Sequence, residues 1–200
     1  HIIVTDGKGF VYTCILLDEN ISGCTLSVES RRQSSGVRPI SLHIAISPLK
    51  NPARFEWFLE KATEIGIEKI TPVICTRTEK HQVKTDRYLN LMISAMKQSE
   101  RTLLPELAEP LLFDDLFRSA LPSQRFVAWC GDSPRPFLPA ILEPGKDTMI
   151  LIGPEGDFTP EEIATATNHS FQPASLGSAR LRTETAGIFA CLAFSIKNHK

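Results

Sequence analysis

The chain has 200 residues, 42% of them hydrophobic, and a formal net charge of −1. This size allows one sizeable hydrophobic core and a smaller module, and the apolar and charged fractions are typical of a globular protein. The chain lacks the large excess of basic residues that is typical of a general nucleic-acid binder. No apolar run approaches the roughly 20 residues of a membrane-spanning helix.

The first thirty residues are predicted to be β-strands, because they are rich in apolar and β-branched residues. The predicted strands are Ile2–Thr5, Val11–Leu17 and Cys24–Val28. Asp6-Gly7-Lys8-Gly9 indicates a hairpin between the first two. Three short strands bury little by themselves, so we expect the end of a small β-module. The start of the chain shows no signal-peptide pattern. It lacks an initial methionine and opens directly on a strand-like run, which favours further residues upstream. The polar stretch 31–38 is the predicted linker.

From Ser41 onward, strands alternate with helices, which predicts an α/β domain with a parallel sheet. The predicted strands are Leu42–Ile46, Ile70–Cys75, Phe126–Trp129, Thr148–Ile152 and Ala174–Leu176. The predicted helices lie between Asn51 and Gly66, over Asp86–Leu103 and Asp114–Ala120, after a capping box at Thr159, and from a cap at Thr183 or Thr185 to about Lys197. The proline-rich stretch Gly131–Pro144 is expected to be mostly irregular.

Two loops that join a strand to a helix are candidate ligand sites. Gly153-Pro154-Glu155-Gly156-Asp157 follows a buried strand, and ligands bind at the carboxyl ends of such strands. It is neither a phosphate-binding P-loop nor a dinucleotide fingerprint, so a structural turn and a ligand loop are both open. Residues 176–185 (LGSARLRTET) place two arginines, a carboxylate and the hydroxyls of two threonines beside a helix start. That set suits a polar ligand, or alternatively a structural Arg–Glu pair with a helix cap.

The remaining polar residues give weaker signals. The five cysteines form no C-x-x-C pair, and the histidines show no metal spacing, so we expect reduced thiols in a cytoplasmic protein and no metal. His43 alternates within a strand and is interpreted as structural. Basic clusters occur at Arg31-Arg32, at Lys80-His81 with Lys84, and at Arg180 with Arg182. A solvated surface explains most such clusters, so charge alone does not indicate RNA.

Taken together, several of these segments resemble the RsmE family of SPOUT methyltransferases. Met149–Glu162 resembles the central motif of that family, and Leu176–Ala186 (LGSARLRTETA) resembles its last motif. The segment from Arg54 to Ile67 resembles its first helix, and Gln98 with Arg101 matches the Q-x-x-R that closes its long helix. Four ordered motifs over nearly the whole chain are a specific signal, although each one alone would be weak.

The resemblance implies a fold, a cofactor and partners. Residues 1–34 would be the C-terminal part of a PUA-like β-barrel for RNA, and residues 38–200 a SPOUT domain with a trefoil knot, which general folding rules would not have suggested. The enzyme would use S-adenosylmethionine to methylate N3 of a uridine in small-subunit ribosomal RNA, within the assembled particle. It would act as a homodimer, without metal or membrane.

The resemblance also implies roles for individual residues. The catalytic candidates are Arg182, Glu184 and Glu155. The cofactor-binding candidates are Ile152, Gly153, Pro154, Glu155, Gly156, Leu176, Gly177, Leu181 and Thr183. The RNA-binding candidates are Arg77, Arg101 and Arg180. Two positions depart from the family pattern. Asp157 stands where the family commonly has a glycine, and Ala179 stands where it commonly has an arginine, with Arg180 as the next residue.

Other functions remain open at this point. Another SPOUT activity, such as ribose 2′-O methylation, would use the same fold, and a non-catalytic RNA-binding module would share the β-module. A nucleotide-binding α/β protein is disfavoured, because the chain lacks the phosphate-loop lysine.

Overall fold

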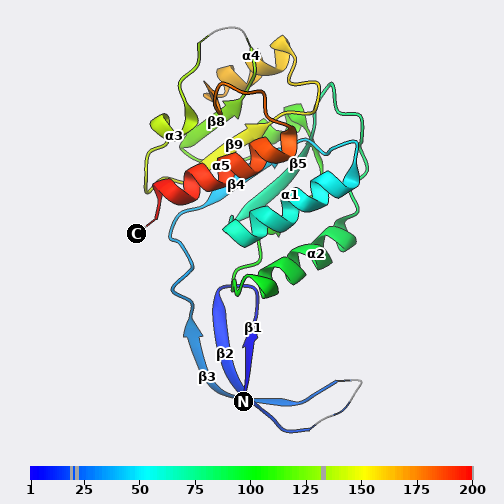
Figure 1. The fold of residues 1–200 in the computed structure, drawn as a ribbon, viewed down its shortest axis with the longest axis vertical. Helices are drawn as coiled ribbons and strands as arrows, with labels where there is room; N and C mark the ends of the chain where they lie inside the picture. The colour runs from blue at the N-terminus through cyan, green and yellow to red at the C-terminus, as the bar shows by residue number, and fades with distance from the viewer. Residues whose placement is uncertain (19, 21–22, 132–133, 200) are drawn as a thin grey trace.

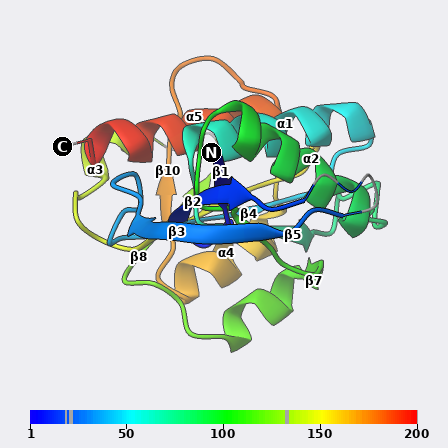
Figure 2. The same ribbon diagram turned by 90° about the horizontal axis from the view of Figure 1, so that it is seen from below.

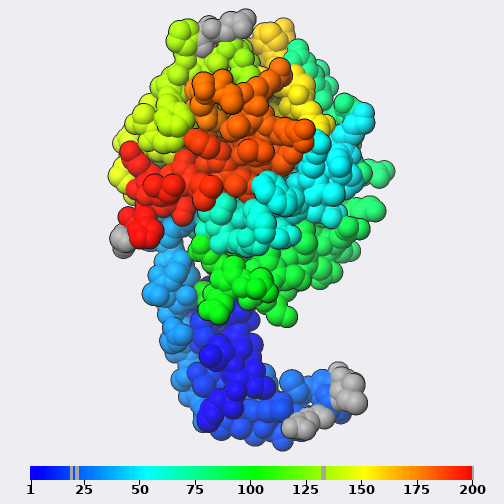
Figure 3. Space-filling model, in the orientation of Figure 1, coloured from blue at the N-terminus to red at the C-terminus, as the bar shows by residue number. Residues whose placement is uncertain are grey.

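The computed structural model describes residues 1–18, 20, 23–131 and 134–199. The N-terminal module is a three-stranded antiparallel sheet in the order β1-β2-β3, and it projects from the rest of the molecule (Figure 1). Its strands are β1 (Ile2–Thr5), β2 (Phe10–Leu16) and β3 (Leu26–Gln33). The predicted hairpin is confirmed: the Asp6 carboxylate accepts hydrogen bonds from the N–H groups of Lys8 at 2.8 Å and Phe10 at 3.2 Å. In the space-filling view the module extends well below the α/β domain (Figure 3).

The linker is shorter than predicted. Residues 31–33 belong to β3, where Arg31 pairs with Tyr12 and Gln33 with Phe10. The Arg31 guanidinium also lies 3.7 Å from the centre of the Phe10 ring. Polar residues therefore continue the strand, because the partner strand supplies backbone hydrogen bonds and an aromatic surface. The connection to the next domain begins at Ser34.

The remaining strands confirm the predicted α/β fold with a parallel sheet. Every described pair in this seven-stranded sheet is parallel, in the order β10-β8-β9-β4-β5-β6, with β7 also on β5. The strands are β4 (Leu42–Ile46), β5 (Lys69–Ile74), β6 (Glu106–Leu107), β7 (Leu111–Leu112), β8 (Gln124–Ala128), β9 (Thr148–Ile152) and β10 (Gln172–Ala174). β4 and β9 lie at the centre of the sheet and are almost completely buried.

Helices cover both faces of this sheet (Figure 2). One face carries α1 (Pro52–Ile65), α2 (Thr85–Gln98) and α5 (Thr183–Lys197), and the other carries η1 (Phe113–Arg118) and α4 (Pro160–Asn168). Side chains alternate along β4, so Ile44 and Ile46 pack in one core cluster and Ala45 in the other. The short helix α3 (Leu138–Ile141) lies beside α5.

Local signals predicted most helix starts correctly. The Asn51 side chain accepts a hydrogen bond from Ala53 N, and Gly66 ends α1 with a φ of 88°. The capping box at Thr159 is present, with both reciprocal hydrogen bonds. The cap of α5 is different from the prediction: Arg182 occupies the N-cap position, and Thr183 is the first helical residue.

Three predictions about chain segments need correction. α2 ends at Gln98 rather than Leu103, because Glu100 adopts a left-handed conformation with a φ of 54°. The predicted helix Asp114–Ala120 is a 3-10 helix that starts at Phe113. The stretch Gly131–Pro144 contains α3, and two of its residues, 132–133, lie outside the described residues. Within the described chain, no helix has both the length and the apolarity needed to cross a membrane.

Candidate active site

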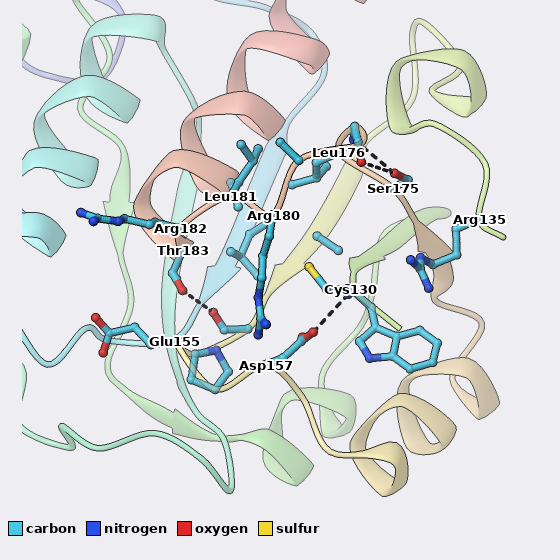
Figure 4. Close-up of a pocket in the computed structure, with 18 of the residues that line it drawn as sticks. Cys130, Arg135, Glu155, Asp157, Ser175, Leu176, Arg180, Leu181, Arg182 and Thr183 are labelled. Atoms are coloured by element: carbon cyan, nitrogen blue, oxygen red, sulfur yellow. Dashed lines mark hydrogen bonds between the residues drawn. The ribbon is translucent and has the colours of Figure 1, made fainter. Parts of the chain in front are cut away.

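A cavity of about 570 Å³ lies at the carboxyl ends of β8, β9 and β10 (Figure 4). We call it the main cavity. Its size falls in the range of small-molecule and cofactor sites. It is lined by Arg54, Ala128, Trp129, Cys130, Arg135, Ile152, Gly153, Pro154, Glu155, Asp157, Ser175, Leu176, Gly177, Ser178, Ala179, Arg180, Leu181, Arg182, Thr183 and Ala186.

The loop after β9 forms one wall of the main cavity. A Cβ atom at Gly153 would lie 2.9 Å from the buried ring of Phe158, so a larger residue here would have to displace the loop or the ring. The Asp157 N–H donates to Pro154 O at 2.9 Å and closes a turn, in which Asp157 has a φ of 63°. The close packing fixes backbone groups of this loop at the cavity wall.

Asp157 also connects this loop to the loop after β8. One oxygen of its carboxylate accepts a hydrogen bond from Phe158 N at 2.8 Å, and the other accepts one from Cys130 N at 3.1 Å. Figure 4 shows this second bond across the floor of the main cavity. An aspartate tolerates the left-handed conformation better than most residues, and here its side chain ties two cavity loops together.

The loop of residues 175–182 forms the opposite wall. Gly177 has a φ of 131°, which only glycine adopts readily, and its N–H donates to the Ser175 hydroxyl at 3.2 Å. The Thr183 hydroxyl is buried and donates to Gly153 O at 3.0 Å. This bond joins the start of α5 to the loop after β9, which explains why Thr183 does not serve as the helix cap.

Charged side chains gather at one end of the main cavity. The Arg54 guanidinium, from the first turn of α1, lies 3.7 Å from a Glu155 oxygen and 3.8 Å from a Glu184 oxygen. The Glu184 side chain is only 9% exposed, and its Oε2 has no hydrogen-bond partner among the described residues. Arg182 is exposed and lies on the same side of the main cavity as Glu155 (Figure 4). Two carboxylates and two arginines can therefore bind, orient and deprotonate a polar substrate here.

Most of the residues singled out from the sequence lie together at the main cavity. Those lining it are Ile152, Gly153, Pro154, Glu155, Leu176, Gly177, Arg180, Leu181, Arg182 and Thr183. Glu184 is buried just behind them. Gly156 is not among the lining residues, and a Cβ atom there would lie 3.3 Å from Arg77.

The structure places Arg77 and Arg101 elsewhere. Arg77 donates to Gly156 O at 2.7 Å and so supports the loop after β9 from outside the main cavity. Arg101 is half-buried against the C-terminal end of α1, where it donates to Glu64 O at 3.0 Å and to Ile65 O. Their predicted contacts with RNA stay predictions.

The sequence reasoning missed the wall formed by the loop after β8. Trp129, Cys130 and Arg135 line the main cavity, and the Arg135 guanidinium lies 5.2 Å from the centre of the Trp129 ring. The available signal was the strand ending at Ala128, because parallel strands end at a common edge. Arg54 was also missed as a site residue, although it stands in the first helix of the recognised pattern.

His43 and the buried cysteines Cys75 and Cys191 lie outside the main cavity and do not contribute chemistry to it. His43 Nε2 lies 2.7 Å from the Thr71 hydroxyl, and burial followed by the nearby Lys69 lowers the His43 pKa to about 4. Burial raises the pKa of the Cys75 and Cys191 thiols, so these are unreactive. All five cysteines are free. Among the described residues, no group of three or more histidine, cysteine or acidic side chains could hold a metal ion.

Comparison with known proteins is consistent with this geometry. Residues 37–195 match the family described as the RNA methyltransferase domain. A Synechocystis protein named ribosomal RNA small subunit methyltransferase E is 31% identical over 190 residues, which cover 92% of this chain and 62% of the relative. The chain thus spans less than two thirds of that relative.

Two solved structures are similar over nearly the whole chain. A probable rRNA-methyltransferase from Porphyromonas gingivalis has a TM-score of 0.92 and 32% identity, over 98% of this chain and 84% of that one. A ribosomal RNA small subunit methyltransferase E from Neisseria gonorrhoeae, bound to S-adenosyl methionine, has a TM-score of 0.87 and 26% identity, over 98% and 83% of the two chains.

Proposed function

Because this chain belongs to the RNA methyltransferase domain family, we propose that it transfers a methyl group from S-adenosylmethionine to N3 of a uridine in small-subunit ribosomal RNA. The observation that carries the proposal is the main cavity, in which the two loops of the recognised motifs face each other at the carboxyl edge of the sheet. The relatives' names support the RsmE resemblance and the substrate class. The ribose 2′-O and non-catalytic alternatives have no observation in their favour.

The main cavity fits the proposed cofactor. Its volume suits a ligand of that size, and its lining includes Gly153 and Gly177, which have no side chain of their own to keep a ligand away from the backbone. Its floor is held by the bond between Asp157 and the Cys130 N–H. When bound, S-adenosylmethionine supplies a sulfonium methyl group that is electrophilic without a metal.

The charged end of the main cavity accounts for the chemistry of the uracil. N3 carries a proton at neutral pH, so a base must accept this proton as the new N3–methyl bond forms, and a carboxylate at the main cavity is suited to that role. Glu155 lines the cavity and Glu184 lies buried behind Arg54, which favours Glu155 as the acceptor and Glu184 as the group that orients Arg54. Arg182 stabilises the charge that develops on O2 or O4. The base must be unpaired, because N3 lies on its pairing edge.

The proposal extends to the architecture of the whole enzyme. Residues 1–34 would be the end of a PUA-like barrel for RNA, and residues 38–200 a SPOUT domain. Its knot would involve the 175–182 loop, which is bonded to the loop after β9 through Thr183 and Gly153. The substrate would be the particle in the cytoplasm, with Arg77, Arg101 and Arg180 contacting RNA.

The proposal also includes a homodimer. Phe137, Leu192 and Ile196 are exposed apolar side chains of α5 and of the residue before α3. An apolar surface of this kind is suited to a partner copy. Light scattering should give twice the 22.2 kDa chain mass, and a single-chain mass at micromolar concentration would contradict the dimer.

The test of the activity is methyl transfer in vitro. Small-subunit particles from cells that lack this gene are incubated with the protein and S-adenosylmethionine, and their nucleosides are analysed by mass spectrometry. We expect 3-methyluridine. A 2′-O-methylated nucleoside would replace the proposed reaction by the ribose activity, and cofactor binding without any product would indicate a non-catalytic module.

A further inference from the structure

A second cavity lies beside the main one, at the N-terminal ends of α1 and α2. It has a volume of about 320 Å³, and we call it the lysine cavity. Its lining residues are Asn51, Pro52, Ala53, Glu56, Lys80, Gln82, Lys84, Arg87 and Tyr88. None of them was assigned a role from the sequence, where Lys80 and Lys84 were interpreted as part of a solvated surface.

The lysine cavity carries uncompensated positive charge. Arg87 and Glu56 form a two-bond ion pair, with both nitrogen–oxygen distances at 2.9 Å, so these two charges cancel. Lys80 and Lys84 have no carboxylate partner within 4 Å in the described parts of the chain, unlike Lys50, which pairs with Glu79 at 2.8 Å. Lys80 and Lys84 thus line one cavity without an ion-pair partner among the described residues, in a chain whose net charge is −1.

The first turn of α1 contributes residues to both cavities. Ala53 lines the lysine cavity and the next residue, Arg54, lines the main cavity and contacts Glu155. Figure 3 shows the start of α1, in cyan, between the orange segment that carries the 175–182 loop and the green segment of α2. A nucleic-acid strand that places a base in the main cavity would therefore pass its neighbouring phosphates close to Lys80 and Lys84.

We propose that the lysine cavity binds backbone phosphate of the RNA strand next to the methylated uridine. The inference rests on the proposed function for the identity of the ligand as RNA. The lysine cavity supplies the place where the RNA phosphates bind. Phosphate contacts set the position of an RNA strand without reading its sequence, so Lys80 and Lys84 would contribute affinity and orientation, while the chemistry stays in the main cavity.

The test compares two double variants that lose the same charge. K80A/K84A removes the free ammonium groups of the lysine cavity, whereas K97A/K197A removes two lysines from the C-terminal ends of α2 and α5. Affinity for a small-subunit rRNA fragment containing the target is measured by fluorescence anisotropy at several salt concentrations, without cofactor. S-adenosylmethionine affinity and methyl transfer at saturating RNA are measured in parallel.

The expected result is a change in salt dependence specific to K80A/K84A. Each lost phosphate contact to a single strand lowers the slope of log affinity against log salt by about 0.7, so two contacts lower it by about 1.4. The factor by which K80A/K84A binds the fragment more weakly than wild type should then be about sevenfold larger at 50 mM salt than at 200 mM salt. Cofactor affinity and the rate at saturating RNA should be unchanged.

Two outcomes would overturn the proposal. Equal slopes for K80A/K84A and K97A/K197A would mean that the lysine cavity contacts no phosphate. Unchanged affinity for the fragment, combined with weaker binding to the assembled particle, would assign the lysine cavity to an acidic protein surface instead. Neither outcome bears on the proposed activity, because methyl transfer by the wild-type protein is scored separately.

Discussion

Replacing Arg182 by alanine separates stability from catalysis at the main cavity. Arg182 is exposed at the N-cap of α5, with extended backbone angles that alanine also adopts. Its guanidinium has no hydrogen bond or ion pair with any described residue. Surface substitutions of this kind change the free energy of unfolding by about 0.5 kcal/mol or less. For a chain of 200 residues, the melting temperature should shift by no more than about 2 °C.

The expected loss of activity is much larger. If Arg182 stabilises charge on the uracil only in the transition state, its removal should lower the rate of methyl transfer by about 10²–10³. This range corresponds to about 2.7–4 kcal/mol in the activation free energy. Arg182→Lys should recover only part of the rate, because lysine keeps the charge and loses the planar, two-donor geometry.

Single-turnover methyl transfer on small-subunit particles, at saturating S-adenosylmethionine, measures this effect directly. Arg118→Ala is the matched control, because it removes an exposed arginine from η1. Among the described residues, Arg118 forms an ion pair with Asp115 alone. The reasoning fails if folded Arg182→Ala transfers methyl groups at a near-normal rate, in which case Arg182 belongs to the surface alone.

Three further predictions concern the cofactor loops and the acid stability of the fold. Gly153→Ala should weaken S-adenosylmethionine binding in calorimetry, because the new Cβ would lie 2.9 Å from the Phe158 ring. Gly156→Ala should weaken it less, since the nearest atom to the new Cβ would be 3.3 Å away, on the flexible side chain of Arg77. Asp157→Gly keeps the left-handed turn but loses the hydrogen bond from Cys130 N in the neighbouring loop. Cofactor affinity should therefore fall, while the rate of methyl transfer at saturating cofactor is retained. An equal loss of affinity and rate would refute a positioning role for Asp157. The His43 pKa is about 4 in the folded state and 6.5 unfolded, so the unfolded state binds the proton more readily and stability falls as pH decreases from 6.5 to 4. Denaturation at several pH values should show a loss of about 3 kcal/mol over that window, absent in His43→Gln.

The elements predicted with correct bounds are those set by local signals. Thr148–Ile152 is a short apolar run between polar residues, and the capping box at Thr159 fixes the start of α4 through its own side chains. The end of α2 was wrong because the left-handed residue that stops it is Glu100, not a glycine or asparagine. The strands β6 and β7 escaped prediction because two residues carry no pattern, and only pairing with β5 makes them strands.

The candidate site could be predicted only in part, because local sequence patterns do not specify which strands are neighbours in the sheet. The two motif loops are recognisable as consecutive residues, and their contact through Thr183 and Gly153 follows from their shared position in the sheet. Trp129 and Cys130 lie more than twenty residues before the first of these loops, at the end of another strand. They join the cavity because β8 and β9 are neighbours, which local patterns do not specify.

The order of the strands constrains when this protein can fold during synthesis. The central pair of the sheet joins Leu42 to Thr148, so its hydrogen bonds close a loop of more than one hundred residues. On the ribosome, β4 must wait without its main partner until β9 has left the exit tunnel, at a synthesis rate of about 5–20 residues per second. The hairpin of β1 and β2 needs only its own first sixteen residues. This hairpin can therefore form early, and β5 can pair with one edge of β4 soon after it is synthesised. The other edge of β4 stays unpaired for about 5–20 s, the interval in which chaperone binding would matter most.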